Sequence, residues 1–384
     1  MPHTSLPWVI IGSGMAGYQL ATELRKLNSE IPLVMISEDS GEVYSKPLLS
    51  TALAKGQSAD QLVSQSGEDK AAALNLTLMP HTRVSGVDAA HKHLTLPDQR
   101  LHFAKLFLAT GAAPIALDAP AGAVCHVNDL QDYRVFRNRL SQAKHPALIL
   151  GGGLVGVEMA QDLLKAGHPV TLITRSDQLL PSLVPAEVSA PLEQALIQQG
   201  LKLIKATQVE RIQAGTDAWS VQLSDGTALS ADLILSALGL RPRTELAASA
   251  GLQVNRGICV DPYLQTSAPD IYALGDCAEI QGRNLMYVQP LMACAKAIAQ
   301  NCLGEPAPLH LEALPILVKT PSCPIVAAPP PPGATGHWQV MDANDQGVVA
   351  HWLDDQNQLG GFALAGTAVR LKAQLTRSLP ALLS

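Results

Sequence analysis

The chain opens with three glycines whose spacing is typical of a phosphate-binding turn. A short apolar run leads into Gly12-x-Gly14-x-x-Gly17, and a helical pattern follows it. Gly12 would permit the tight turn, Gly14 the close approach of a pyrophosphate, and Gly17 the packing of helix against strand. The free N–H groups and the positive dipole end of the helix would favour the same phosphates. The motif therefore predicts a dinucleotide-binding βαβ unit.

A second strand completes this unit and supplies an acid. Ile31–Ser37 is predicted as a strand, and Glu38 follows it. The carboxylate lies about 20 residues after the last glycine, where this motif places an acid for ribose hydroxyls. A glycine turn without function is the alternative, but strand, helix, second strand and acid together favour binding. The residues expected to contact the dinucleotide here are Gly12, Ser13, Gly14, Met15, Ala16, Gly17, Ser37 and Glu38.

The same pattern returns in the second half of the chain. Another apolar run feeds Gly151-x-Gly153-x-x-Gly156, and Glu158 lies on the helix that follows. Arg175 stands where the first unit has its acid. A cation there suits the 2′-phosphate of NADP, whereas an arginine that simply points to solvent is an equally open interpretation. The sequence thus predicts two dinucleotide sites and leaves NADH against NADPH undecided.

Two later core strands end in residues suited to a cofactor. Lys105–Leu108 is followed by Ala109–Gly111, small residues that would let the chain pass close to a ligand. Ile271–Leu274 is followed by Gly275 and Asp276, and an acid at the carboxyl end of a core strand usually borders a ligand crevice. Asp276 is therefore expected to hydrogen-bond the ribityl hydroxyls of a flavin. A predicted helix over 289–299 would direct its positive end at the reduced flavin.

Composition and charge argue against several classes of protein. The chain is 47 % hydrophobic and 4 % aromatic, and it has no apolar run near the ~20 residues of a membrane span. A net charge of −6 disfavours nucleic acid and anionic membrane as partners. A strand is predicted directly after residues 1–4, so no signal peptide is expected, and a cytoplasmic location follows.

The cysteines are predicted to be structural. None belongs to a Cys-x-x-Cys pair, and none groups with histidine at metal-ligand spacing, so no metal site is expected. Buried thiols in a reducing cytoplasm are the simplest interpretation. No cysteine precedes Cys125.

These motifs resemble those of the two-dinucleotide flavoprotein reductases related to glutathione reductase, over nearly the whole chain. More narrowly, Tyr44–Pro47, Gly239–Leu246, Gly275–Glu279 and Val318–Pro321 resemble segments of the rubredoxin reductases and their close relatives, the flavorubredoxin reductases. The resemblance implies FAD in the first domain and NAD(P)H in the second. It also implies that electrons pass to rubredoxin, a small acidic iron protein, often in alkane hydroxylation or in defence against oxygen and nitric oxide.

The resemblance also implies roles for particular residues. Lys46 would lie beside flavin N5, and Glu158 would pair with it and reach the nicotinamide side, which makes both catalytic; a surface ion pair without chemistry is the alternative. Val84 would offer its backbone to adenine. The remaining residues expected to bind cofactor are Lys46, Pro47, Ala109, Thr110, Gly111, Gly151, Gly153, Gly156, Glu158, Arg175, Asp276, Val288 and Lys319, of which Val288 and Lys319 would touch the far side of the flavin.

One departure from the wider superfamily concerns sulfur. Disulfide reductases have a Cys-x4-Cys beside the flavin, and NADH peroxidases and coenzyme A disulfide reductases have one cysteine near the position of Ser45. A serine cannot form a sulfenic acid or a mixed disulfide. Electrons would therefore leave from the flavin itself, which suits a one-electron iron acceptor. Two rival functions are a ferredoxin reductase that serves an oxygenase and a non-catalytic flavoprotein that senses redox state.

The fold class expected is α/β, with two Rossmann-like dinucleotide-binding domains and a small α+β C-terminal domain. The expected bounds are 1–111 with 241–314 for the FAD domain, 112–240 for the NAD(P)H domain and 315–384 for the C-terminal domain. Within these, single strands are predicted over 74–84 and 231–237, and the last domain is predicted to have strands over 338–341, 348–353 and 361–364 and a helix over 367–379. The last domain is smaller than the dimerisation domain of the superfamily, so a monomer is expected.

Overall fold

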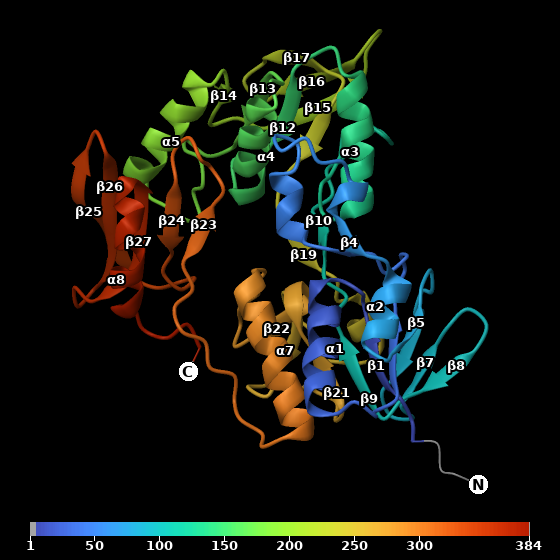
Figure 1. Ribbon diagram of the computed structural model, residues 1–384. Helices are drawn as coiled ribbons and strands as arrows, with labels where there is room; N and C mark the ends of the chain where they lie inside the picture. Colours follow the sequence, from blue (N-terminus) through green and yellow to red (C-terminus); the bar gives the residue numbers. More distant parts are fainter. Residues whose placement is uncertain (1–4, 384) are drawn as a thin grey trace.

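The structure of this chain is a computed structural model that describes residues 5–383. Residues 1–4, on which the expected absence of a signal peptide was based, and residue 384 lie outside the described residues. Three units are visible in Figure 1: a first unit at the bottom, a second unit at the top and a C-terminal unit on the left. The first and second units each have a parallel sheet with helices, so the predicted α/β class is confirmed.

The first unit is built on a five-stranded parallel sheet of short apolar strands. Its order is β21-β9-β1-β2-β5, with the strands Ile271–Ala273, Lys105–Leu108, Trp8–Ile11, Leu33–Ile36 and Thr77–Met79. Most side chains of β21, β9, β1 and β2 are buried, as in parallel sheets covered on both faces, whereas those of the edge strand β5 are partly exposed. Helices α1 (Met15–Leu27) and α7 (Val288–Leu303) pack together against one face (Figure 1). The first glycine motif lies at the turn from β1 into α1.

Short elements surround this sheet. They are the hairpin β3 (Val43–Tyr44) and β4 (Val63–Gln65), the 3-10 helices η1 (Lys46–Ser50), η2 (Asp60–Leu62) and η3 (Gly275–Cys277), helices α2 (Gly67–Ala73) and α6 (Glu245–Ser249), the meander β6 (Gly86–Asp88), β7 (His93–Thr95) and β8 (Arg100–His102), and the pair β20 (Ile258–Val260) and β22 (Ala278–Ile280). The residues of β6–β8 bury the other face of the sheet.

The second unit repeats the plan. Its parallel sheet has the order β11-β18-β12-β13-β14, with the strands Val124–Cys125, Ile234–Ser236, Ala147–Leu150, Val170–Ile173 and Lys202–Ile204. Helices α3 (Leu130–Gln142) and α4 (Leu154–Lys165) contribute to the core on one face. The meander β15 (Val209–Ala214), β16 (Trp219–Leu223) and β17 (Ala228–Ala231) packs on the other. The chain enters and leaves this unit through β10 (Ala112–Pro114) and β19 (Leu240–Pro242), which pair antiparallel between the two sheets (Figure 1).

The C-terminal unit is a five-stranded antiparallel sheet that is covered on both sides. Its order is β23-β24-β27-β26-β25, with the strands Ile316–Val318, Ile325–Ala328, Leu359–Gly366, Gly347–Asp354 and Gly336–Asn344. One face packs on α5 (Ala186–Gln198) of the second unit and shares its core. The other face packs on the 3-10 helix η4 (Thr367–Leu371) and on α8 (Lys372–Arg377). The unit therefore shares part of its hydrophobic core with the rest of the chain.

Two predicted strands are wrong in extent. Within 74–84 only Thr77–Met79 is strand, because the next residues turn back to bond the end of β2, with Thr82 N–H donating to Ser37 O at 2.7 Å. The predicted strand over 231–237 is two strands, because Asp232 accepts hydrogen bonds from Lys144 N–H and His145 N–H and so interrupts it. The first part joins the meander and the second joins the parallel sheet.

The C-terminal predictions are correct for three strands and incomplete for the rest. The strands over 338–341, 348–353 and 361–364 correspond to the cores of β25, β26 and β27. Strands β23 and β24 were not predicted. The predicted helix over 367–379 is a 3-10 turn followed by the short helix α8.

Candidate functional site

Among the three glycines of the first loop, only Gly14, where a phosphate is expected, has room for a further group. A Cβ on Gly12 would lie 2.2 Å from Ala109 O, and a Cβ on Gly17 would lie 1.9 Å from Gly12 O, so neither position accepts a side chain. A Cβ on Gly14 would meet no atom within 4 Å. Gly14 is also the N-cap of α1, whose first N–H groups have no partner within the helix. The loop thus fits a pyrophosphate at Gly14.

The acid that reaches this loop is Asp39 and not the predicted Glu38. The Glu38 side chain is 72 % exposed and pairs with Arg83 at 3.5 Å. Asp39 Oδ1 accepts hydrogen bonds from the hydroxyls of Ser13 at 3.0 Å and Ser37 at 2.5 Å. Both acids follow the same strand, and the sequence signal alone could not choose between neighbours. We therefore transfer the expected ribose contact from Glu38 to Asp39 as a proposal.

Asp276 lies at the same edge as the first glycine loop. A Cβ on Gly275 would lie 2.8 Å from the Cβ of Ala16 in the first turn of α1, so only glycine lets these two segments approach. Asp276 follows in η3, at the carboxyl end of the strand β21. Its Oδ2 atom is 3.4 Å from Nζ of Lys46. The structure thus brings together the first glycine loop, the Lys46 segment and Asp276, which are distant in sequence.

The second glycine loop repeats the geometry of the first. A Cβ on Gly151 would lie 2.5 Å from Ala237 O, and one on Gly156 would lie 2.0 Å from Gly151 O. A Cβ on Gly153, the N-cap of α4, would meet nothing within 4 Å. This loop therefore has the space and the helix end that a second pyrophosphate requires. Arg175 is exposed just beyond β13.

Glu158 is buried one turn into α4, and its carboxylate has partners on two other segments. It is 3 % exposed. Its Oε2 atom accepts a hydrogen bond from Ser50 Oγ at 2.6 Å and is 2.8 Å from Nζ of Lys319. The backbone N–H of Lys319 donates to Oε1 at 3.0 Å. The predicted ion pair between Lys46 and Glu158 is therefore absent, because Lys319 occupies the carboxylate and Lys46 pairs with Asp276 instead.

The segment that carries Lys46 is fixed to α4 along one side. Pro47 occupies the first turn of η1, where its fixed φ and missing N–H are tolerated. One helical turn beyond Glu158, the carboxylate of Asp162 accepts the backbone N–H groups of Leu53 at 2.9 Å and Ala54 at 3.0 Å. Burial raises the pKa of Asp162, which the two N–H donors partly oppose. Asp162 was not among the predicted site residues, since the sequence around an acid within a helix does not show which groups it will bind.

The remaining predicted contacts lie at this edge or near it. Ala109 lies under Gly12, and Thr110 Oγ1 donates to Arg243 O at 3.0 Å beside the returning strand β19. Val288 is the first residue of α7 and is partly exposed. Val84 is buried between β5 and β6. Their contacts with cofactor stay predictions.

The thiols of this chain are not suited to redox chemistry. All six cysteines are free. Burial raises the pKa of each thiol, to about 12 for Cys125 and Cys294. A thiolate is the reactive form of cysteine, so a raised pKa makes each of them less reactive. Residue 45, where some superfamily members have a cysteine, is a serine.

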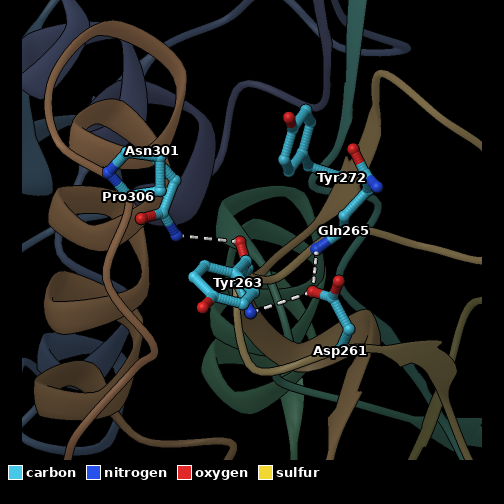
Figure 2. Close-up of a pocket in the computed structure, with 6 residues that line it drawn as sticks. All are labelled: Asp261, Tyr263, Gln265, Tyr272, Asn301 and Pro306. Carbon is cyan, nitrogen blue, oxygen red and sulfur yellow. Dashed lines mark hydrogen bonds between the residues drawn. The ribbon is translucent and has the colours of Figure 1, made fainter.

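A separate pocket lies far from this edge (Figure 2). Its lining comes from the loop after β20 and from the end of α7, where Asn301 lies about 20 Å along the helix from Val288. Asn301 donates to Tyr263 O at 3.1 Å, and Asp261 accepts the N–H groups of Tyr263 and Gln265, both at 2.9 Å. These polar groups bond to one another and so stabilise the loop.

The described residues contain neither a metal-binding cluster nor a helix suited to a membrane. In residues 5–383 no three or more side chains of His, Cys, Asp or Glu are grouped to hold a metal ion. In the same residues, no helix is both long enough and apolar enough to cross a bilayer.

The chain is similar to known proteins over almost its whole length. Residues 7–300 match the family described as pyridine nucleotide-disulphide oxidoreductase, and residues 308–379 match the rubredoxin binding C-terminal domain. A rubredoxin-NAD(+) reductase of Alcanivorax borkumensis is 42 % identical, over 98 % of this chain and 99 % of its own. A nitric oxide reductase FlRd-NAD(+) reductase of Escherichia coli O139:H28 is 39 % identical, over 97 % and 98 %.

A solved structure shares the arrangement of the units. It is the covalent putidaredoxin reductase-putidaredoxin complex, which matches with a TM-score of 0.87 and 27 % identity over 97 % of this chain and 94 % of that one. The chain that contains the two glycine loops, the Lys46 segment and the C-terminal sheet is thus similar to reductases over 97–98 % of its length. The chain therefore belongs to the pyridine nucleotide-disulphide oxidoreductase family and, within it, to the rubredoxin reductases.

Proposed function

We propose that this protein is an FAD-dependent enzyme that passes electrons from NAD(P)H to rubredoxin. FAD is bound by residues 1–111 and 241–314, NAD(P)H by 112–240, and the acceptor at 315–384. One observation carries the proposal: the match to a rubredoxin-binding domain, residues 308–379, includes Lys319, which contacts the Glu158 carboxylate beside the second glycine loop. The acceptor domain and the nucleotide site thus share a side-chain contact.

When bound, FAD supplies the chemistry that connects the two substrates, since it accepts a two-electron hydride and releases single electrons. The protein binds and orients. The space at Gly14 and the free N–H groups of α1 hold one pyrophosphate, and Gly153 with α4 holds the other. Lys46 and Asp276 place one positive and one negative side chain at the carboxyl edge of the first sheet.

The state of the cysteines supports direct electron transfer to the acceptor. Ser45 cannot take part in thiol exchange, and burial raises the pKa of all six thiols. The absence of disulfides among these six cysteines also supports a reducing compartment, and we propose the cytoplasm. We further propose that the protein is a monomer, because α5 and α8 cover the two faces of the C-terminal sheet.

The function is tested by reduction of cytochrome c coupled through rubredoxin, with NADH and NADPH in turn. We expect turnover with rubredoxin to exceed turnover with a [2Fe–2S] ferredoxin at least ~10-fold in kcat/KM. A variant with all six cysteines replaced by serine or alanine should keep this activity. Preference for ferredoxin would favour the rival reductase, and bound FAD without NAD(P)H-driven reduction of either acceptor would favour a redox sensor. Loss of activity in a folded cysteine-free variant would contradict direct transfer.

Arg175 provides a test of nucleotide preference. If its guanidinium binds a 2′-phosphate, Arg175→Ala should raise KM for NADPH about 10-fold and leave KM for NADH within about twofold. Steady-state kinetics with both nucleotides measure this ratio. Arg211→Ala, on β15 of the same unit, serves as control for a general change of surface charge. Equal KM values for the variant and the wild type with NADPH would mean that Arg175 only points to solvent.

A further inference from the structure

Lys319 connects three segments that are distant in sequence. Its ammonium is 2.6 Å from Pro47 O, 2.8 Å from Ser50 Oγ and 2.8 Å from Glu158 Oε2. An ammonium has three N–H donors, and each of these oxygens takes one. Lys319 lies in the turn between β23 and β24, so these contacts join the C-terminal unit to η1 of the first unit and to α4 of the second.

The buried charge of Glu158 makes this contact more than a surface ion pair. A carboxylate that is 3 % exposed requires a cation or several donors. Lys319 supplies the cation and also a backbone N–H, while Ser50 supplies a hydroxyl. Each donor comes from outside the unit that carries Glu158. The carboxylate of the second unit is therefore satisfied only when the other two units are in place.

Helix α4 makes a second contact with the turn between β23 and β24 that carries Lys319. Gln161, three residues after Glu158, accepts a hydrogen bond from Ser322 Oγ. From the same face of α4, Asp162 binds the backbone after η1 through Leu53 N–H and Ala54 N–H. One face of α4 thus fixes both the turn that carries Lys319 and the segment that carries Lys46.

The arrangement also decides which acid Lys46 meets. Lys46 is also a cation at this site, and it lies 3.4 Å from Asp276 with its side chain 35 % exposed. Because Lys319 satisfies Glu158, Lys46 remains available at the edge where Asp276 and the first glycine loop lie. Lys319 thus pairs with Glu158 beside the second glycine loop, and Lys46 pairs with Asp276 beside the first.

We propose that Lys319 is a positioning residue for hydride transfer: the acceptor-binding domain uses it to fix Glu158 on the nucleotide side and to leave Lys46 with Asp276. This inference rests on the proposed function and deepens it. In it, the C-terminal domain completes the site at which the flavin is reduced by NAD(P)H, in addition to receiving the acceptor.

The test compares Lys319→Met with Lys205→Met. Lys205 is the matched control because its Nζ is also 2.8 Å from an oxygen of a mostly buried glutamate, Glu193, but in a contact that lies within the second unit alone. We expect Lys319→Met to speed hydrogen–deuterium exchange of peptides covering 314–322 at least ~10-fold and to slow NADH-driven flavin bleaching at least ~10-fold. Lys205→Met should change neither more than about twofold. Lys319→Arg should recover most of the bleaching rate, since it retains the charge.

Pairing with Glu158→Gln distinguishes positioning from simple loss of structure. Because both residues act through one contact, the double variant should bleach no more slowly than the slower single variant. Three outcomes would each overturn the inference. The effects of the two substitutions could multiply in the double variant. Lys319→Met could bleach at a rate within twofold of the wild type, or it could bleach more slowly without faster hydrogen–deuterium exchange. Neither readout uses rubredoxin. Failure of the wild type to reduce rubredoxin would therefore count against the proposed function alone.

Discussion

Gly14→Val and Gly153→Val are expected to give two folded proteins, of which the first fails to bind FAD and the second binds FAD but fails to react with NADH. Both glycines have extended backbone that valine adopts readily, with φ of −68° and −80°, and a Cβ at either position meets no protein atom. The added side chain fills only the space expected for a pyrophosphate. Gly14→Val should therefore retain less than about a tenth of the wild-type FAD content, because its loop no longer admits the phosphates.

Gly153→Val should be yellow and almost unreactive toward NADH. Its FAD site is unchanged, so we expect the flavin to be bleached normally by dithionite. The value of kcat/KM with NADH should fall at least ~100-fold, which corresponds to about 2.7 kcal/mol. Absorbance spectra and stopped-flow reduction measure both effects, and circular dichroism checks the fold.

The pair of variants controls for itself, since each change is the same substitution in an equivalent loop. If Gly14→Val kept FAD and lost reaction with NADH, the two sites would have to be exchanged between the units. Normal FAD content and normal kinetics in both variants would contradict dinucleotide binding at these helix ends.

The glycine loops could be predicted from sequence because their geometry is local. Within six residues, Gly12 has a φ of +113° that favours glycine, and a Cβ on Gly17 would lie 1.9 Å from Gly12 O. Which of Glu38 and Asp39 points toward the loop is decided by a segment that is distant in sequence. It depends on the turn at 80–82, which bonds to the end of β2 and sets the direction of the chain there. A spacing rule cannot resolve a difference of one residue.

The pairing of charges could not be predicted either. Lys46, Glu158 and Lys319 come from three units, and which cation meets the buried acid depends on how those units pack. The resemblance indicated that all three belong to the site, but the pair that it implied, Lys46 with Glu158, is not the one in the structure. Asp232 illustrates the same limit within the fold, because its contact with the 144–145 turn ends one strand and begins another.

Lys46→Met is expected to leave FAD bound and to slow its reduction by NADH at least ~10-fold, about 1.4 kcal/mol in the barrier. The ammonium is the only part lost, since methionine keeps a similar unbranched stem. Asp276 then lacks the cation that lies 3.4 Å away, and the edge of the first sheet becomes more negative where negative charge develops on reduction. Stopped-flow absorbance with saturating NADH measures the rate.

The matched control for this substitution is Lys92→Met. Lys92 pairs with Asp270 and has a side chain 38 % exposed, close to that of Lys46, but it lies on the meander side of the same unit. Its replacement should leave the rate within about twofold, since an exposed pair contributes little. A Lys46→Met rate equal to that of the control would remove Lys46 from the reaction. A slow rate in Lys46→Met alone would mean that the ion pair on the first unit, and not only the Glu158 contact on the second, sets how fast electrons enter.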